Sequence, residues 1–189
     1  EGVVREADVV LSVLVPAEAE RIADEVIAAM EAVGKRPPFV DCNAIAPQTV
    51  ARIAKRIEAA GAVFVDAGII GQPPKPGEQR TRLHCSGPDT SAFEALAKNG
   101  LDVRRVGPTI GQASGLKMVY ASSTKGTYAL WTELFVAAHA LDLSKALMQE
   151  LSDSVIAREM ISSIPDTPRR ARRWVTEMEE IALTFEGLG

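Results

Sequence analysis

The first 107 residues alternate between short apolar runs and stretches with helical spacing. The run Val9–Val15 is continuously apolar and rich in β-branched residues, which predicts a strand buried on both faces. Helices are expected to begin at Pro16 and Pro47 and to end at Gly34 and Gly61. Further strands are expected at residues 39–42, 62–66, 80–85 and 103–106. This alternation predicts an α/β fold with a mostly parallel, doubly wound sheet.

The pattern changes after residue 107, where only helical spacing remains. One long helix is expected over about residues 112–141, shorter helices within 144–163, and a last helix from Thr167. The last helix is expected to present one apolar stripe, made of Ala171, Trp174, Val175, Met178, Ala182 and Phe185. The sequence therefore predicts two domains, residues 1–107 and residues 108–189, the second of them all-α.

Composition excludes several classes of protein. The 189 residues are 47% hydrophobic, with a net charge of −4 and a pI near 5.3, which argues against disorder and against a general affinity for nucleic acid or membrane surfaces. Cys42 and Cys85 lie singly, and only His84 and His139 could join a transition-metal site, so no metal site is predicted. The simplest interpretation of the cysteines is a reducing, cytoplasmic location. The most apolar long segment, residues 110–141, carries charged residues and is not expected to span a membrane.

Candidate ligand sites lie where predicted strands end, because ligands in open α/β sheets bind beyond the carboxyl ends of the strands. Three segments leave predicted strands there, at residues 15–17, 42–45 and 67–71. Each can also be an ordinary connection between a strand and a helix. No GxGxxG follows a strand, so the glycine turn that holds the phosphates of a dinucleotide is not found.

Lys117 is the strongest candidate for chemistry. Gly111 and Gly115 precede it and allow close backbone approach on one helix face. A lysine in an otherwise apolar turn loses solvation of its charge, which suits it to act as a general acid or base near neutral pH. At helical spacing, Tyr120 and Thr124 share its face. Alternatively, the lysine extends its ammonium group to solvent, and the pattern leaves both interpretations open.

A basic run opens the last predicted helix, with four arginines within residues 169–173. One interpretation is a clamp for a carboxylate or phosphate. The favoured interpretation is a solvated helix face paired with the glutamates Glu177, Glu179 and Glu180, because cations gain nothing at a helix N-terminus.

Four segments carry a resemblance to a known family: residues 7–16 (ADVVLSVLVP), 40–47 (VDCNAIAP), 64–72 (FVDAGIIGQ) and 107–117 (GPTIGQASGLK). In this order they resemble a fourth Rossmann strand with its proline-containing loop, an aspartate-x-serine-threonine motif, a substrate loop, and the glycine-rich entry to a helix with a catalytic lysine. These are motifs of the β-hydroxyacid dehydrogenase family, which includes 3-hydroxyisobutyrate dehydrogenase and is related to 6-phosphogluconate dehydrogenase.

The resemblance implies an incomplete Rossmann-like, doubly wound sheet followed by an all-α domain, with NADP or NAD as the cofactor. It implies that Lys117 is the general acid/base that exchanges a proton with the substrate hydroxyl. The residues that it places beside the nicotinamide and its ribose are Leu14, Val15, Asn43 and Ala44. The residues that it places in the substrate-carboxylate loop are Ile70, Gly71 and Gln72, and Tyr120 and Thr124 are added from the helical spacing.

This sequence departs from the family's pattern at several of these positions. Ala121 replaces an asparagine four residues after the lysine, Ile70 replaces the serine of the substrate loop, Gln72 replaces its second glycine, and Glu177 replaces a late lysine. The implied reaction is hydride transfer to or from a small hydroxy acid or a related carbinol or carbonyl. Two alternatives stay open: an imine reductase-like enzyme, and a non-catalytic, dimeric ligand-binding module.

The resemblance also bears on partners and on the extent of the chain. It implies a homodimer through the helical domain, and the apolar character of residues 110–141 supports this. A small-molecule substrate is the other expected partner. Members of the family begin with a βαβ segment that carries GxGxxG, so we expect this chain to be a piece of a longer protein.

Overall fold

The computed structural model describes residues 1–73 and 81–189, which divide into two compact units. The first unit comprises residues 1–119 and 179–189, and the second comprises residues 120–178. The expected boundary at residue 107 falls within the first unit. The helix that follows residue 107 is tied to the sheet of this unit by hydrogen bonds described below.

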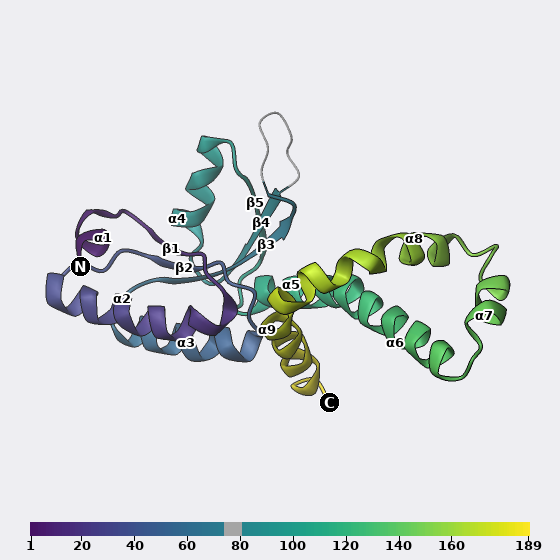
Figure 1. Cartoon of the computed structure of the whole chain (residues 1–189). Coiled ribbons are helices and arrows are strands. Elements are labelled where there is room, and N and C mark those ends of the chain that lie inside the picture. Colours follow the sequence, from purple (N-terminus) through teal and green to yellow (C-terminus); the bar gives the residue numbers. More distant parts are fainter. Residues whose placement is uncertain (74–80) are drawn as a thin grey trace. The chain divides into compact units, whose positions relative to one another are not determined.

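A five-stranded sheet forms the centre of the first unit, in the order β1-β2-β3-β4-β5 (Figure 1). The strands are β1 (Val10–Ser12), β2 (Phe39–Asp41), β3 (Phe64–Gly71), β4 (Thr81–Ser86) and β5 (Asp102–Gly107). Neighbouring strands pair parallel, except that β3 and β4 pair antiparallel. The prediction of a mostly parallel α/β sheet followed by helices is confirmed.

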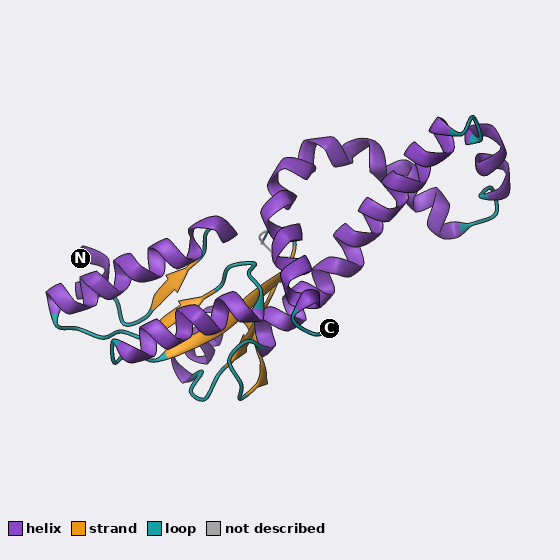
Figure 2. Ribbon diagram, turned by 90° about the horizontal axis from the view of Figure 1, so that it is seen from below, coloured by secondary structure: helices purple, strands orange, loops and turns teal. Residues whose placement is uncertain are grey.

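Helices cover both faces of this sheet (Figures 1 and 2). The helices are α1 (Gly2–Glu6), α2 (Ala19–Val33), α3 (Pro47–Ala59) and α4 (Ser91–Glu94), with 3-10 turns at Pro16–Glu18 and Ala95–Asn99. Helices α2 and α3 lie side by side on the face that bears Phe39 and Phe64, whose rings lie 6.1 Å apart. The opposite face packs Val65 and Cys85 against Phe93 of α4. We call the first of these faces the α3 face.

The predicted starts and ends of α2 and α3 are confirmed. Pro16 begins the turn that leads into α2, and Pro47 is the first residue of α3. Gly34 and Gly61 follow the two helices with φ values of 75° and 83°, in the left-handed region that glycine adopts without strain. These signals are local, so they could be predicted from neighbouring residues alone.

Two strand predictions are wrong in extent. The first strand is only three residues long, and Val13, expected within it, is 57% exposed, because β1 lies at one end of the sheet order and pairs with β2 alone among the described strands. The third strand continues to Gly71, because residues 66–71 pair antiparallel with β4. Residues 67–71, expected as a loop, therefore form a strand. Arg80, the expected start of the fourth strand, lies outside the described residues.

The single helix expected over residues 112–141 is interrupted. The structure has α5 (Gln112–Ala121), a π-helical segment (Ser122–Gly126) and α6 (Thr127–Ala140). Hydroxyl groups in this segment bond to nearby carbonyls: Thr124 Oγ1 donates to Ala121 O at 3.0 Å, and Thr127 Oγ1 donates to Ser123 O at 2.7 Å. The π turn interrupts the α-helical spacing that the placement of Thr124 on the face of Lys117 assumed, so that placement stays a prediction.

The second unit is entirely helical outside its connecting turns. It contains α6, α7 (Ser144–Glu150), α8 (Val155–Ser163), a 3-10 turn (Ile164–Asp166) and the first part of α9 (Thr167–Glu186). Helices α6 and α9 meet where the rings of Tyr128 and Trp174 lie 5.9 Å apart, and Lys125 of the preceding π-helical segment pairs with Glu177 of α9. Leu130 and Val136 of α6 are 67% and 59% exposed, so this helix is apolar well beyond its buried side.

The predicted apolar stripe of α9 is wrong in part. Ile181 and Thr184 are the buried residues of this helix, and Trp174 and Met178 are half-buried. The other members of the expected stripe are exposed: Ala171, Val175, Ala182 and Phe185. The buried side of α9 differs from the predicted stripe because Glu177 and Glu180 make hydrogen bonds to other elements, and their side of the helix is therefore packed.

Candidate functional site

A row of buried polar residues crosses the α3 face near the carboxyl ends of β1 and β2. Strand register places Ser12 opposite Asp41, Asp41 opposite Asp66, and Asp66 opposite Ser86. All four side chains are buried. Because buried polar groups need hydrogen-bond partners, each of the two carboxylates organises the loops or helix beside it.

Asp41 and Asn43 join the ends of β1 and β2. Asp41 accepts hydrogen bonds from the Asn43 backbone N–H at 2.9 Å and from Asn43 Nδ2 at 3.0 Å. Asn43 Nδ2 also lies 2.9 Å from Ser12 Oγ, and its Oδ1 accepts from the backbone N–H of Leu14 at 2.6 Å. The structure therefore brings Leu14 and Asn43 together. Val15 and Ala44 adjoin them in the chain, with Val15 63% exposed and Ala44 half-buried.

Asp41 is expected to make stability depend on pH. Burial raises the pKa of its carboxyl from 3.8 to about 6, the charge of Asp66 acts in the same direction, and the bonds from Asn43 oppose them. The folded chain therefore binds this proton more tightly than the unfolded chain does. Its contribution to the free energy of unfolding is full below about pH 4 and is lost as the pH rises through about 6. The shift corresponds to about 3 kcal/mol.

Urea denaturation of the wild type and of Asp41→Asn at about pH 5 and about pH 7.5 measures this contribution. The wild type is expected to lose more stability than the variant between the two pH values. An identical pH dependence in both proteins would show that Asp41 does not titrate in this way.

Asp66 ties the start of α5 to the sheet. Its Oδ2 accepts from the backbone N–H groups of Gly111 and Ala113, both at 3.0 Å, and of Ser114 at 3.1 Å. Its carboxylate also accepts from Ser86 Oγ at 2.8 Å and Ser114 Oγ at 2.5 Å. A carboxylate at a helix N-terminus satisfies free N–H groups and favours the helix dipole. Sequence reasoning missed this role, although Asp66 lies at the end of an apolar strand run.

Close backbone contacts then set α5 against β3 and α3. A Cβ added to Gly68 would lie 2.9 Å from the Ala113 carbonyl oxygen and 3.1 Å from Lys117 Cβ. A Cβ added to Gly111, whose φ is 96°, would lie 3.3 Å from Pro47 Cβ. The predicted close approach at Gly111 is confirmed, and only glycine allows it at these two positions.

Lys117 lies on α5, half-buried, with its Nζ donating to the Ile69 carbonyl of β3. One strand thus fixes the start of the helix through Asp66 and receives the lysine through Ile69. Ile70 and Gly71 also belong to this strand: Ile70 is buried, whereas Gly71 and the following Gln72 are exposed. Lys117 and the end of β3 therefore meet.

Tyr120 and Thr124 belong to the second unit, and both side chains are exposed. Their roles as substrate-binding residues remain predictions.

The glutamates of α9 do not pair as predicted. Glu180 accepts from the backbone N–H of Ala46 at 2.6 Å and from Thr49 Oγ1 at 3.1 Å, so it caps the N-terminus of α3. Glu177 pairs with Lys125 of the π-helical segment. The expected pairing of these two residues with the basic run is wrong, since Glu180 bonds to the start of α3 and Glu177 bonds to Lys125. The four arginines are exposed.

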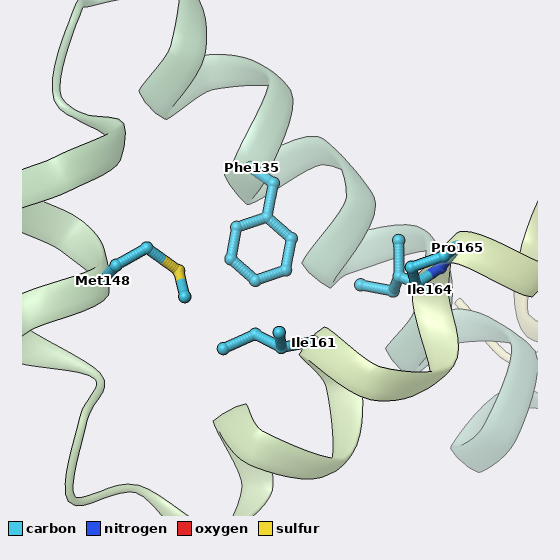
Figure 3. Close-up of a pocket in the computed structure, with 5 residues that line it drawn as sticks. All are labelled: Phe135, Met148, Ile161, Ile164 and Pro165. Carbon is cyan, nitrogen blue, oxygen red and sulfur yellow. The ribbon is translucent and has the colours of Figure 1, made fainter.

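An apolar pocket of about 230 Å³ lies within the second unit (Figure 3). Phe135, Met148 and Ile161 point toward one another there, and Ile164 and Pro165 complete its wall. None of the candidate residues from the sequence lines it.

Over residues 1–73 and 81–189, no group of three or more His, Cys, Asp or Glu side chains is placed to hold a metal ion. Within the same residues, no helix has the length and apolar character needed to cross a membrane.

Comparison with known proteins identifies the family to which this chain belongs. Residues 1–99 match the NAD binding domain of 6-phosphogluconate dehydrogenase, and residues 138–189 match a domain of unknown function (DUF1932). The chain belongs to the family of this NAD binding domain. The resemblance, the Rossmann-like fold class and the prediction of NAD or NADP as cofactor are confirmed.

Individual relatives extend this comparison. The solved conserved protein MTH1747, described as similar to 3-hydroxyacid dehydrogenases, is 32% identical with a TM-score of 0.70, covering 97% of this chain and 69% of that one. An uncharacterized 28.5 kDa protein of Methanothermus fervidus is 29% identical over 82% of this chain, which spans 57% of that relative's length. An imine reductase from Myxococcus stipitatus in complex with NAD+ shares the fold at 17% identity and a TM-score of 0.55, covering 89% of this chain and 60% of that one.

Proposed function

We propose that this chain is part of an NAD(P)-dependent oxidoreductase that acts on a small hydroxy acid or a related carbinol or carbonyl compound. The observation that carries the proposal is the placement of Lys117 against the end of β3, in a chain that belongs to an NAD-binding family. Two elements fix this lysine: the Asp66-capped helix and the strand that accepts its Nζ. Such preorganisation is what a general acid/base requires.

The carboxyl edge of β1 and β2 fits a nicotinamide and its ribose. Leu14 and Val15 offer exposed apolar side chains, and the side-chain amide of Asn43 is fixed by three hydrogen bonds. We assign these residues, with Ala44, to the cofactor side of the site. When bound, NAD(P) supplies or accepts the hydride.

Lys117 would handle the proton of the same reaction. Its Nζ accepts the hydroxyl proton as the carbinol is oxidised and returns a proton to the oxygen as the carbonyl is reduced. Ile70, Gly71 and Gln72 would border the substrate on the β3 side. The assignment of Tyr120 and Thr124 to substrate binding stays a prediction. Ala121, the next turn after Lys117, is buried and offers no polar group. This feature keeps imine reduction as a second candidate.

A homodimer through the helical unit belongs to the same proposal. Helix α6 is apolar on nearly all sides and leaves Leu130 and Val136 largely exposed, and Val175 of α9 is exposed as well. Apolar surface of this kind is stable when a second copy covers it. The buried, unpaired thiols of Cys42 and Cys85 fit the proposed cytoplasmic location.

Fluorescence titration of the full-length protein with NADH and NADPH tests cofactor use. We expect binding well below millimolar concentration for at least one of them, and Val15→Asp is expected to weaken it about tenfold through charge repulsion with the cofactor. Val3→Asp, at a similarly exposed valine of α1, is the matched control and should leave the affinity unchanged. Failure of both nucleotides to bind would leave the non-catalytic module as the better interpretation.

A further inference from the structure

A cluster of basic side chains lies on the α3 face of β4 and β5, outside the residues assigned so far. Residues 82, 84 and 86 of β4 share the face of Asp66, Gly68 and Ile70, because directly opposite residues in a sheet project to the same side. His84 lies opposite Gly68 on one side and Arg104 of β5 on the other. Arg82 lies opposite Ile70 and Asp102.

This cluster lies on the strand next to β3, which Lys117 contacts. Gly68 has no side chain, and the space above it is filled by the Ala113 carbonyl and Lys117 Cβ. His84 is the cross-strand neighbour of Gly68, at the strand spacing of about 5 Å, and so lies on the strand next to the one that Lys117 contacts. Arg82 has the same relation to Ile70, which follows the carbonyl that Lys117 contacts.

The electrostatics of the cluster are positive. The pKa of His84 is lowered first by burial and then by the charges of Arg104 and Arg82, with Asp102 opposing them more weakly. Asp102 holds Arg104 in a two-pronged contact, with Nε–Oδ1 at 2.9 Å and Nη2–Oδ2 at 2.7 Å. Arg82 and His84 are both half-buried, which strengthens the field at this face relative to fully solvated charges.

We propose that Arg82 and His84, beside Lys117, form the subsite that receives an oxyanion group of the substrate, a carboxylate or a phosphate. The inference rests on the proposed function and deepens it by naming the substrate class as anionic. Ile70, which the resemblance places in the carboxylate-binding loop, is buried and aliphatic and donates no side-chain hydrogen bond. Arg82 lies opposite this isoleucine on the neighbouring strand and supplies the planar donor fork that suits oxyanions.

NMR of the full-length protein at constant ionic strength tests the subsite without any turnover. The imidazole signals of His84 and His139 are followed while inorganic phosphate or 3-hydroxypropanoate is added, with the His84 signal assigned through His84→Gln. An oxyanion beside Arg82 favours the charged imidazole, so we expect the pKa of His84 to rise while the signal of His139 stays still. Arg82→Gln is expected to weaken the apparent affinity about tenfold or more, and Arg82→Lys to restore part of it.

The matched control is Arg52→Gln, which removes an equal charge from an exposed arginine of α3. A response to phosphate alone, or to the hydroxy acid alone, supports the subsite and identifies the anion. If neither probe moves the His84 signal, or if Arg82→Gln responds like the wild type, the subsite is wrong. If the full-length protein binds neither NADH nor NADPH but its His84 signal still responds to the anion, the proposed function is wrong and the anion subsite is supported.

Discussion

Replacing Lys117 with methionine is expected to lower kcat by about 10²–10⁴-fold on the substrate that the full-length protein turns over. The side-chain volume is kept while the group that would move the hydroxyl proton is lost. The hydrogen bond from the half-buried Nζ to the Ile69 carbonyl is lost, and loss of such a bond lowers the free energy of unfolding by about 1 kcal/mol. Steady-state kinetics with hydroxy acids and with imines, together with urea denaturation, measure both effects.

Lys55→Met is the matched control, since Lys55 is exposed on α3 and belongs to no candidate site. It should retain wild-type kinetics. Full turnover by the Lys117→Met variant would remove this residue from its proposed role, whatever the substrate. If the free energy of unfolding falls by as much as the activation free energy rises, Lys117 has a structural role rather than a chemical one.

Local signals account for the parts of the fold that were predicted correctly. Pro16, Pro47, Gly34 and Gly61 act on their immediate neighbours, so their effect on helix starts and ends can be read from the chain itself. The extent of β3 could not be read in this way. Residues 67–71 look like a glycine-containing loop, and they become a strand because β4, a distant segment, supplies their hydrogen bonds.

The same distinction separates the predicted and the missed parts of the site. Lys117 stands out because a charged residue follows a glycine-rich helix start, which is a local pattern. Asp66 reaches partners 45 to 48 residues further along the chain, and Glu180 caps a helix whose bonded groups lie 131 and 134 residues away. A single sequence carries no marker for such pairs. The aspartate at the end of an apolar strand was the only available sign for the first of them.

Replacing Asp66 with alanine is expected to lower the free energy of unfolding by about 3–5 kcal/mol. The change leaves the backbone N–H groups of Gly111 and Ser114 and the hydroxyls of Ser86 and Ser114 without this acceptor in a buried place, while the Ala113 N–H keeps only Ser86 Oγ, at 2.9 Å. Urea denaturation gives the size of the loss. Asp66→Asn, which keeps one acceptor oxygen, should fall between the wild type and the alanine variant.

Amide hydrogen exchange distinguishes a specific anchor from general destabilisation. In Asp66→Asn, the amides of Gly111, Ala113 and Ser114 should exchange faster than the rest of the sheet, because the carboxylate that holds them is gone. Asp41→Asn is the matched control, since it changes the buried aspartate directly opposite, whose bonds go to Asn43 rather than to α5. If both variants speed exchange at the start of α5 equally, Asp66 is an ordinary buried residue. A selective effect would mean that the strand receiving Lys117 also sets the position of its helix.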